Sequence, residues 1–353
     1  MFKSLSISRF RGISDLELEG LTQINLLLGK NNAGKTTAME ALFLLCGATT
    51  PSLPMTACHL RGQRVFGSHP DSSWRSLFWQ MDPRCPLSIS AEYDDEPHPR
   101  RLEISATMVS RDLQGLEDIG VASTSDDQLI EGLRLHYTNG YDDEFITKAR
   151  YEAERQSIDA ATQERTDYVR GTFLTARSYS TMERDAQQFS HLLRIKQEQE
   201  IVDALAVIEP RVQRVEVLSE SGRPAVYVDL GLPSLIPLAA CGEGFVRFFS
   251  IVVEVTGCRR GVLLVDEIDN GLHHSVMSKL WMLLANLCQK HQVQLVATTH
   301  NEELVTSAVE GLGEAVDDLT VFRLDRHEDS HTAMRYDSEM LRSATLENIE
   351  IRG

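Results

Sequence analysis

The sequence predicts an α/β fold in which buried parallel strands bring polar side chains to one edge of a sheet. Three apolar runs carry this prediction, at residues 24–28, 262–265 and 294–299. The first ends in a glycine-rich loop, the second in two carboxylates and the third in a histidine. Continuous apolar runs are typical of strands that are buried on both faces of a sheet, and ligands bind at the carboxyl ends of such strands.

The first 46 residues predict three short strands, a loop and a helix. Apolar and polar residues alternate in two segments separated by the turn Arg11-Gly12, and a second turn at Glu19-Gly20 precedes the run 24–28. After the loop, apolar residues recur at helical spacing, at Met39, Leu42, Phe43 and Leu45. We therefore expect antiparallel N-terminal strands, then a buried strand, the loop and its helix.

The loop itself matches the phosphate-binding pattern G-x-x-x-x-G-K-[ST] between Gly29 and Thr36. Its glycines let successive backbone N–H groups point inward, and the helix N-terminus adds partial positive charge. Lys35 is expected to reach the β- and γ-phosphates of a nucleotide, and the Thr36 hydroxyl to bind Mg²⁺. The other predicted nucleotide-binding residues of the loop are Gly29, Asn31, Asn32, Ala33, Gly34 and Thr37.

Arg11 is a further candidate, because it stands in an arginine- and phenylalanine-rich segment just before the loop. It could approach the α-phosphate or the base. A solvated arginine at a strand end explains the same residue, so both interpretations stay open.

Two later strands supply the rest of a nucleotide site. The run 262–265 ends in Asp266 and Glu267. Asp266 is expected to join the Mg²⁺ shell, and Glu267 to orient the attacking water, because phosphoryl transfer needs both functions. One predicted helix later, the run 294–299 ends in His300, which could contact the γ-phosphate. A lone histidine at a strand end is otherwise a structural residue.

Other segments are read more coarsely. Residues 47–85 look irregular, with one buried helical turn around Trp74–Trp79. The polar, acid-rich residues 110–170 predict a solvated insertion or arm that contains a strand at 133–137. The remaining expected elements are strands at 87–93, 101–108 and 172–175, helices within 181–209, a hairpin at 212–218 and 224–230, a helix at 276–288 and a last strand at 319–324.

A glycine-flanked turn opens an apolar helix between the hairpin and the carboxylate strand. It contains Cys241, Gly242, Glu243 and Gly244. Free N–H groups at a helix N-terminus make an anion site, and a plain glycine-mediated helix start is the alternative.

Bulk properties narrow the class of protein. With 353 residues, 42% of them hydrophobic, the chain can build a full core. The net charge of −17 disfavours a general nucleic-acid coat but does not exclude a local basic groove. No apolar run approaches the roughly 18 residues of a membrane span, and no signal peptide is visible. Six scattered cysteines without a CxxC pair fit a reduced, cytoplasmic compartment.

These motifs in this order resemble the ABC-type ATPases of the SMC, RecF and OLD class. The segments that carry the resemblance are 7–12, 29–36, 242–247, 261–274 and 297–300. The last two look most like stand-alone, OLD-related AAA15-type bacterial ATPases. The resemblance implies an ABC-type P-loop ATPase head that binds ATP and Mg²⁺, with Lys35, Glu267 and His300 as its catalytic residues.

The same resemblance implies that two heads close face to face on ATP, as a homodimer or within a higher oligomer. The signature residues would then act on the partner's nucleotide, and a D-loop would lie at the seam of the dimer. The signature residues are Cys241, Gly242, Glu243, Gly244 and Arg247, and the D-loop contains Asp269 and Asn270.

Some features depart from that class. Cys241 stands where the signature usually has a serine, whose hydroxyl is a better donor, so hydrolysis could be slow. The Q-loop glutamine has three candidates, Gln80, Gln187 and Gln188. No long coiled coil is visible, and no room remains for the TOPRIM domain that OLD nucleases carry after the ATPase.

We therefore expect one ABC-type ATPase domain over residues 1–353. Lobe I would comprise 1–109 and 245–353, an arm 110–171, and a helical and signature lobe 172–244.

The first functional hypothesis is a cytoplasmic ATPase whose head dimerisation controls a separately encoded nuclease or toxin, in anti-phage defence, without a membrane partner. The second is a DNA-repair or chromosome-associated ATPase that binds DNA directly. The third is a nucleotide-gated scaffold with little hydrolysis. Candidate DNA-binding residues are Arg61, Arg64, Arg75, Arg84, Arg100 and Arg101.

Overall fold

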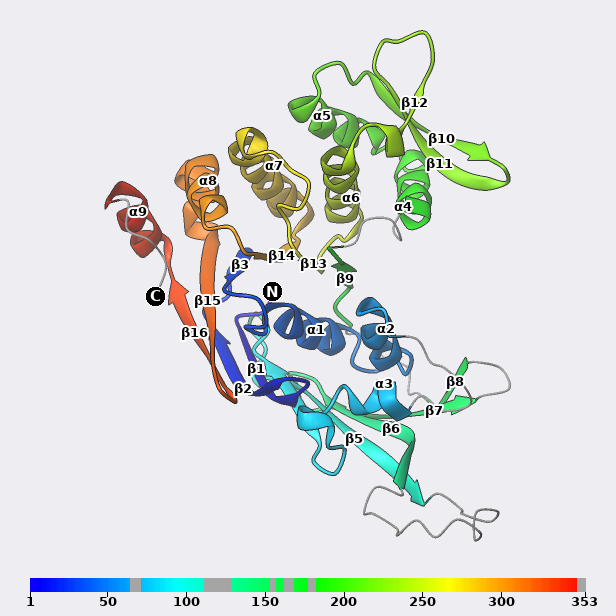
Figure 1. Cartoon of the computed structure of the whole chain (residues 1–353), viewed down its shortest axis with the longest axis vertical. Helices are drawn as coiled ribbons and strands as arrows, with labels where there is room; N and C mark the ends of the chain where they lie inside the picture. Colours follow the sequence, from blue (N-terminus) through cyan, green and yellow to red (C-terminus); the bar gives the residue numbers. More distant parts are fainter. Residues whose placement is uncertain (64–70, 111–127, 153–156, 162–167, 177–181, 348–353) are drawn as a thin grey trace.

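The computed structural model of the chain describes residues 1–63, 71–110, 128–152, 157–161, 168–176 and 182–347. Its strands form three sheets, and Figure 1 shows helices on both sides of the sheet at the centre of the molecule. A mixed sheet joins the two halves of the chain, and an antiparallel sheet takes its strands from the first half. The predicted α/β class with antiparallel N-terminal strands is confirmed.

A six-stranded sheet carries the phosphate-binding loop. Its order is β16-β15-β3-β14-β13-β9, with parallel pairing from β15 to β9 and antiparallel pairing only at β16. Because the parallel strands share one direction, the residues that follow them meet at one carboxyl edge. The strands are β3 (Ile24–Leu28), β9 (Gly171–Leu174), β13 (Val262–Val265), β14 (Gln294–Thr299), β15 (Leu319–His327) and β16 (Ser330–Tyr336).

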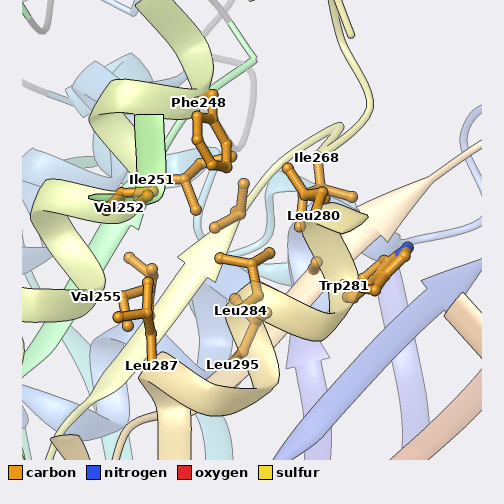
Figure 2. Packing of buried hydrophobic residues seen from close by; sticks show 14 of the residues in the cluster. Phe248, Ile251, Val252, Val255, Ile268, Leu280, Trp281, Leu284, Leu287 and Leu295 are labelled. Carbon is orange, nitrogen blue, oxygen red and sulfur yellow. The ribbon is translucent and has the colours of Figure 1, made fainter. Parts of the chain in front are cut away.

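Alternate residues of this sheet enter two different cores. Leu26 and Leu28 pack into one core, whereas Leu27 packs into the other. The second core includes apolar residues of α1 (Lys35–Cys46). The first includes residues of α6 (Glu243–Gly257), α7 (His274–His291) and α8 (Glu303–Leu312), and Figure 2 shows α6 and α7 meeting over Leu295. Each fully buried leucine contributes about 1.5–3 kcal/mol, so the two cores hold the strand ends in place.

The N-terminal strands begin a seven-stranded antiparallel sheet, ordered β2-β1-β4-β5-β6-β7-β8. Two of its strands, β7 and β8, were not expected within the polar arm. In β7 the inward residues Thr147 and Ala149 are small or polar, so the strand lacks a strong apolar pattern. The strands are β1 (Ser4–Phe10), β2 (Ile13–Glu19), β4 (Leu87–Ala91), β5 (Arg100–Ser110), β6 (Gln128–Thr138), β7 (Glu144–Glu152) and β8 (Ser157–Ala161).

The prediction that residues 47–85 are irregular was wrong at one place, because α2 (Leu53–Leu60) is a helix. Pro54 suggested a break, but it lies in the first helical turn, where proline is tolerated. The expected buried turn is formed by α3 (Asp71–Arg75) and η1 (Trp79–Met81), with Trp74 buried.

The expected helices and hairpin between β9 and α6 are present. They are α4 (Met182–Arg194), α5 (Glu198–Ile208), β10 (Arg214–Glu220) and β11 (Arg223–Asp229), followed by β12 (Ile236–Pro237) and η3 (Leu238–Ala240). In Figure 1 they lie above β9 and β13, on the same side of the sheet as α6.

The prediction that 319–324 is the last strand was wrong. The segment lies in β15, which follows η4 (Gly313–Asp318), and the chain continues into β16 and α9 (Ser338–Glu347). The alternation in β16 is weak, since only His331 and Tyr336 are buried. Across the residues described here, no helix is both long and apolar enough to cross a membrane. The division into two lobes and an arm stays a prediction.

Candidate functional site

Lys35 fills the curl of the phosphate-binding loop. Gly34, in the left-handed region at φ 94°, leads into α1, of which Lys35 is the first residue. The Lys35 Nζ donates to the carbonyl oxygens of Gly29 (2.6 Å) and Lys30 (2.9 Å). Burial lowers the pKa of Lys35 to about 8, partly opposed by the charges of Asp266 and Glu267. The ammonium group therefore lies at the place where the loop would bind a phosphate. The two carbonyl oxygens hold it more weakly than a phosphate would.

Asp266 links the second strand end to the loop. Its Oδ1 accepts hydrogen bonds from the hydroxyls of Thr36 (3.0 Å) and Thr298 (2.8 Å). A carboxylate and a hydroxyl at this spacing fit the hard oxygen ligands that Mg²⁺ prefers. In the described part of the chain, no group of three or more His, Cys, Asp or Glu side chains could hold a metal alone. Mg²⁺ would therefore depend on nucleotide oxygens and water for its other ligands.

Glu267 and His300 complete a line of contacts to Lys35. His300 Nδ1 lies 3.1 Å from Lys35 Nζ, and its Nε2 lies 3.3 Å from Glu267 Oε1. A neutral imidazole fits both contacts, with Nδ1 accepting from the lysine and Nε2–H donating to the carboxylate. Glu267 adopts a left-handed backbone at φ 49°, and its N–H donates to Thr298 Oγ1 (2.8 Å). Left-handed residues other than glycine are concentrated at functional sites.

The structure therefore brings Lys35, Thr36, Asp266, Glu267 and His300 together at one edge. The other loop residues, Gly29 and Asn31–Gly34, precede Lys35 in the sequence. Thr37 is buried in the first turn of α1.

Arg11 makes its contacts away from the carboxyl edge. Its guanidinium is buried, with Nε 2.9 Å from Glu40 Oε2 and Nη2 donating to the Ala57 carbonyl (3.1 Å). A contact between Arg11 and a bound nucleotide thus stays a prediction.

Arg61 lies beside the phosphate-binding loop, a position that no local sequence pattern around it indicated. Its Nη2 donates to Thr37 Oγ1 (2.8 Å), and its Nε lies 2.7 Å from Glu40 Oε1. Thr37 directly follows the two loop residues that define the motif, so a second cation stands beside the loop. The signal in the sequence was Glu40, a carboxylate on the buried face of α1 that requires a cationic partner.

The signature turn separates into an exposed part and a buried part. Gly242 and Glu243 are exposed, and Cys241 is half-buried with its Sγ near the Pro237 carbonyl oxygen (3.7 Å). Arg247 is 1% exposed and donates to the carbonyl oxygens of Thr175 (2.6 Å) and Asp266 (2.5 Å). Arg247 thus joins β9 to β13 within its own chain, and the expectation that it acts across a dimer stays a prediction.

The predicted D-loop residues tie the turn after β13 to its neighbours. Asp269 Oδ1 accepts from Thr299 Oγ1 (2.9 Å), and Asn270 Nδ2 donates to the Ala176 carbonyl (3.1 Å). Gly271 and Gly244 are in backbone contact, since a Cβ on Gly244 would collide with the Gly271 carbonyl.

The Q-loop glutamine is still unassigned. Gln80 lies in η1, Gln187 is exposed on α4, and Gln188 lies against Gly257 at the end of α6.

Comparisons with solved structures support the fold. The Smc head bound to the C-winged helix domain of ScpA matches with a TM-score of 0.52 at 10% identity, covering 97% of this chain and 99% of that one. An Smc head with an extended coiled coil, bound to the C-terminal domain of ScpA derived from Pyrococcus furiosus, matches with a TM-score of 0.50 at 9% identity, covering 99% of each chain. The chain therefore has the fold of an ABC-type P-loop ATPase head.

Sequence relatives point the same way. A protein named ATP/GTP phosphatase from Helicobacter pylori is 20% identical over 328 residues, which is 86% of each chain. Uncharacterized protein MJECL10 from Methanocaldococcus jannaschii is 50% identical over 48 residues, 14% of this chain and 22% of that protein. A family described as "AAA domain, putative AbiEii toxin, Type IV TA system" matches residues 24–306, from β3 into α8. With most of its length inside that match, including Lys35, Glu267 and His300, the chain belongs to this family of AAA-domain ATPases.

Proposed function

We propose that the protein hydrolyses ATP at the carboxyl edge of the six-stranded sheet, and that a second copy completes the site. The observation that carries the first part is the line of contacts from Lys35 through His300 to Glu267, none longer than 3.3 Å. A cation for phosphate, a carboxylate for water and an imidazole between them are the groups that phosphoryl transfer to water requires.

Each side chain has a definite task in this reaction. The β- and γ-phosphates replace the carbonyl oxygens of Gly29 and Lys30 as partners of Lys35, and raise its pKa again. Glu267 accepts a hydrogen bond from the attacking water and holds it in line with the γ-phosphate. His300 keeps Glu267 in position through Nε2–H and turns toward the γ-phosphate when Lys35 moves. Mg²⁺, held through Thr36 and Asp266, supplies charge neutralisation on the β- and γ-oxygens.

The second part of the proposal rests on the exposed turn Cys241–Gly244. Gly242 has φ 94° and open space where a side chain would stand, so its backbone is accessible to another molecule. Backbone N–H groups at the start of α6 suit an anion. Since the same chain places its own Lys35 on a different element, we propose that the turn meets the γ-phosphate held by a partner copy.

A complementation experiment tests this arrangement. Lys35→Ala removes the phosphate contact, and Cys241→Asp places a carboxylate on the signature turn, where the backbone has an ordinary negative φ. Each variant alone should be inactive. If the two are mixed and form dimers at random, half of the dimers regain one of two sites, so about a quarter of the wild-type rate should return.

The matched control is a mixture of Lys35→Ala with Lys35→Ala,Cys241→Asp, which holds no intact pair of elements and should stay inactive. Full activity of Cys241→Asp by itself, or a mixture no more active than its parts, would show that the turn plays no role in trans.

The finer role that we propose is control of a separately encoded effector, such as a toxin or nuclease, in anti-phage defence. One consideration supports it: the Smc heads of similar fold are bound to a partner protein. The family description links the AAA domain itself to a type IV toxin–antitoxin system. Purification of tagged Glu267→Gln with ATP and Mg²⁺, followed by mass spectrometry, should retain that effector. Retention of DNA alone would favour the chromosome-associated alternative.

Direct DNA binding is the less favoured alternative because four of its six candidate arginines are paired with carboxylates. Arg75, Arg84 and Arg100 pair with Asp71, Asp82 and Glu96, each from a neighbouring position in the chain. Arg61 is engaged at Glu40, Arg101 is exposed on β5, and Arg64 lies outside the described residues.

A further inference from the structure

The hairpin of β15 and β16 reaches the phosphate-binding loop from more than 280 residues away in the chain. Strand β15 pairs with β3 until Arg323 stands opposite Leu28, so the next residues, Leu324 and Gly29, are neighbours. A Cβ on Gly29 would collide with the Leu324 carbonyl oxygen. The first glycine of the loop is therefore required by the hairpin as well as by the curl of the loop.

The second glycine meets the same hairpin through a side chain. His331 of β16 places Cδ2 3.2 Å from the position that a Cβ on Gly34 would occupy, and Ile13 Cδ1 lies 3.3 Å from it on β2. Gly34 thus occupies a slot between an imidazole ring and an isoleucine. Its φ of 94° sets the direction in which the chain enters α1 and presents Lys35.

The His331 ring is built into this slot as a packing surface. It is 8% exposed, and its Nδ1 is buried without a hydrogen-bond partner. Burial lowers the pKa of His331, and the charge of Arg326, its cross-strand neighbour on β15, acts in the same direction. A neutral ring without a polar partner at Nδ1 contributes through its shape.

The hairpin is itself tied to the N-terminal sheet. Ser14 Oγ donates to the Asp329 carbonyl oxygen in the hairpin turn (2.8 Å). The ring is therefore held between two strands and a fixed turn, and it cannot follow the loop if the loop moves.

We propose that His331 is a positioning residue for the phosphate-binding loop: its ring fixes the backbone at Gly34 so that Lys35 and the loop N–H groups are arranged before nucleotide arrives. This inference rests on the proposed ATPase function for its kinetic consequence, but its structural consequence exists without nucleotide. Preorganisation lowers the cost of binding, so loss of the ring should weaken nucleotide affinity while leaving the chemical step intact.

The test compares His331→Ala with His331→Phe, which keeps a ring in the slot. The control is His327→Ala, which removes an exposed histidine from the same hairpin. In nucleotide-free protein, hydrogen exchange of amides 30–36 should be about tenfold faster in His331→Ala, and unchanged in His331→Phe and His327→Ala. Exchange in β15 and β16 should remain within twofold of wild type in all three.

The kinetic readout is a split between KM and kcat. His331→Ala should raise the KM for ATP about tenfold and leave kcat within twofold, because Glu267 and His300 are untouched. The ring in His331→Phe should restore KM.

The outcomes separate the two proposals. Unchanged loop exchange in His331→Ala, or a His331→Phe variant that behaves like His331→Ala, overturns the positioning role whether or not the protein hydrolyses ATP. A wild-type protein without ATPase activity overturns the proposed function, while the exchange measurement still decides the role of His331.

Discussion

The carboxyl edge of the six-stranded sheet and the turn Cys241–Gly244 differ in how complete each is within one chain. At the edge, Lys35, His300 and Glu267 already contact one another. At the turn, Gly242 has no atom within 4 Å of the position where a Cβ would stand, and Glu243 is exposed.

The edge and the turn are therefore suited to different kinds of ligand. Converging side chains with mutual contacts are preorganised for a small ligand, which then replaces partners such as the carbonyl of Gly29. An exposed turn at a helix start suits a surface that arrives from outside. The buried Arg247, which bridges β9 and β13, joins the two regions within one chain.

The largest expected effect breaks the chemistry at the edge and leaves the turn intact. Glu267→Gln removes the group that orients water, so kcat should fall about 100-fold or more while ATP affinity stays within threefold. ATP-bound dimers should then accumulate, which light scattering with ATP and Mg²⁺ would detect. Glu303→Gln, an exposed carboxylate on α8, is the control. Normal turnover by Glu267→Gln would remove Glu267 from the mechanism.

The second effect sharpens the role of the buried lysine. Burial lowers the pKa of Lys35 to about 8, and a bound phosphate favours its charged form. ATP affinity should therefore be constant below pH 8 and weaken above it, by at most about tenfold per pH unit. Fluorescent nucleotide titrations between pH 6.5 and about 9.5 measure this, within the range where proteins of ordinary stability remain folded.

Lys35→Arg should bind more weakly but lose that pH dependence, since arginine stays charged. In the free protein the sign is opposite for stability. Between pH 8 and the ordinary lysine pKa of 10.5 the unfolded chain binds more protons, so the cost of burying this cation is relieved as pH rises. A flat affinity profile in the wild type would contradict the assignment.

A smaller effect concerns the second cation at the edge. Arg61→Ala should weaken ATP binding about fivefold, because its guanidinium holds Thr37 beside the loop and only part of the about 1.5–3 kcal/mol of a hydrogen bond to a charged group is passed on to ligand binding. Arg84→Ala, which removes an exposed arginine paired with Asp82, should bind ATP normally. Equal losses in both variants would point to a general charge effect. Isothermal calorimetry distinguishes the two.

The smallest expected effect tests the turn. Cys241→Ser introduces a hydroxyl, a stronger donor than a thiol, at the position where related signatures carry serine. If the turn meets a partner's γ-phosphate, steady-state phosphate release should rise about threefold, because one hydrogen bond to a charged group becomes stronger. The control is Cys85→Ser, which changes an exposed cysteine and should leave the rate unchanged. Cys46→Ser does not serve as a control because Cys46 is buried. A rate that falls would argue against the trans contact.

The sequence by itself determined the nucleotide edge. A loop of fixed spacing and two apolar runs that end in Asp266-Glu267 and His300 required parallel buried strands, and parallel strands that share a direction must gather their ends. Local patterns were sufficient because Asp266, Glu267 and His300 directly follow their strands, and Lys35 follows β3 across one loop of fixed spacing. The same reasoning failed for α2, β7, β8 and β16, where proline or a weak apolar pattern hid the element.

Only the tertiary structure decided which distant residues support that edge. Arg61 at Thr37, Arg247 between two strand ends and His331 against Gly34 are separated from their partners by 19 to 297 positions, and no local periodicity links them. The His331 contact arises because strand order brings β15 beside β3 and places β16 near β2, and the contacts of Arg61 and Arg247 arise because α2 and α6 pack near the same sheet. Short-range spacing thus fixes where chemistry occurs, while long-range packing fixes how firmly its groups are held.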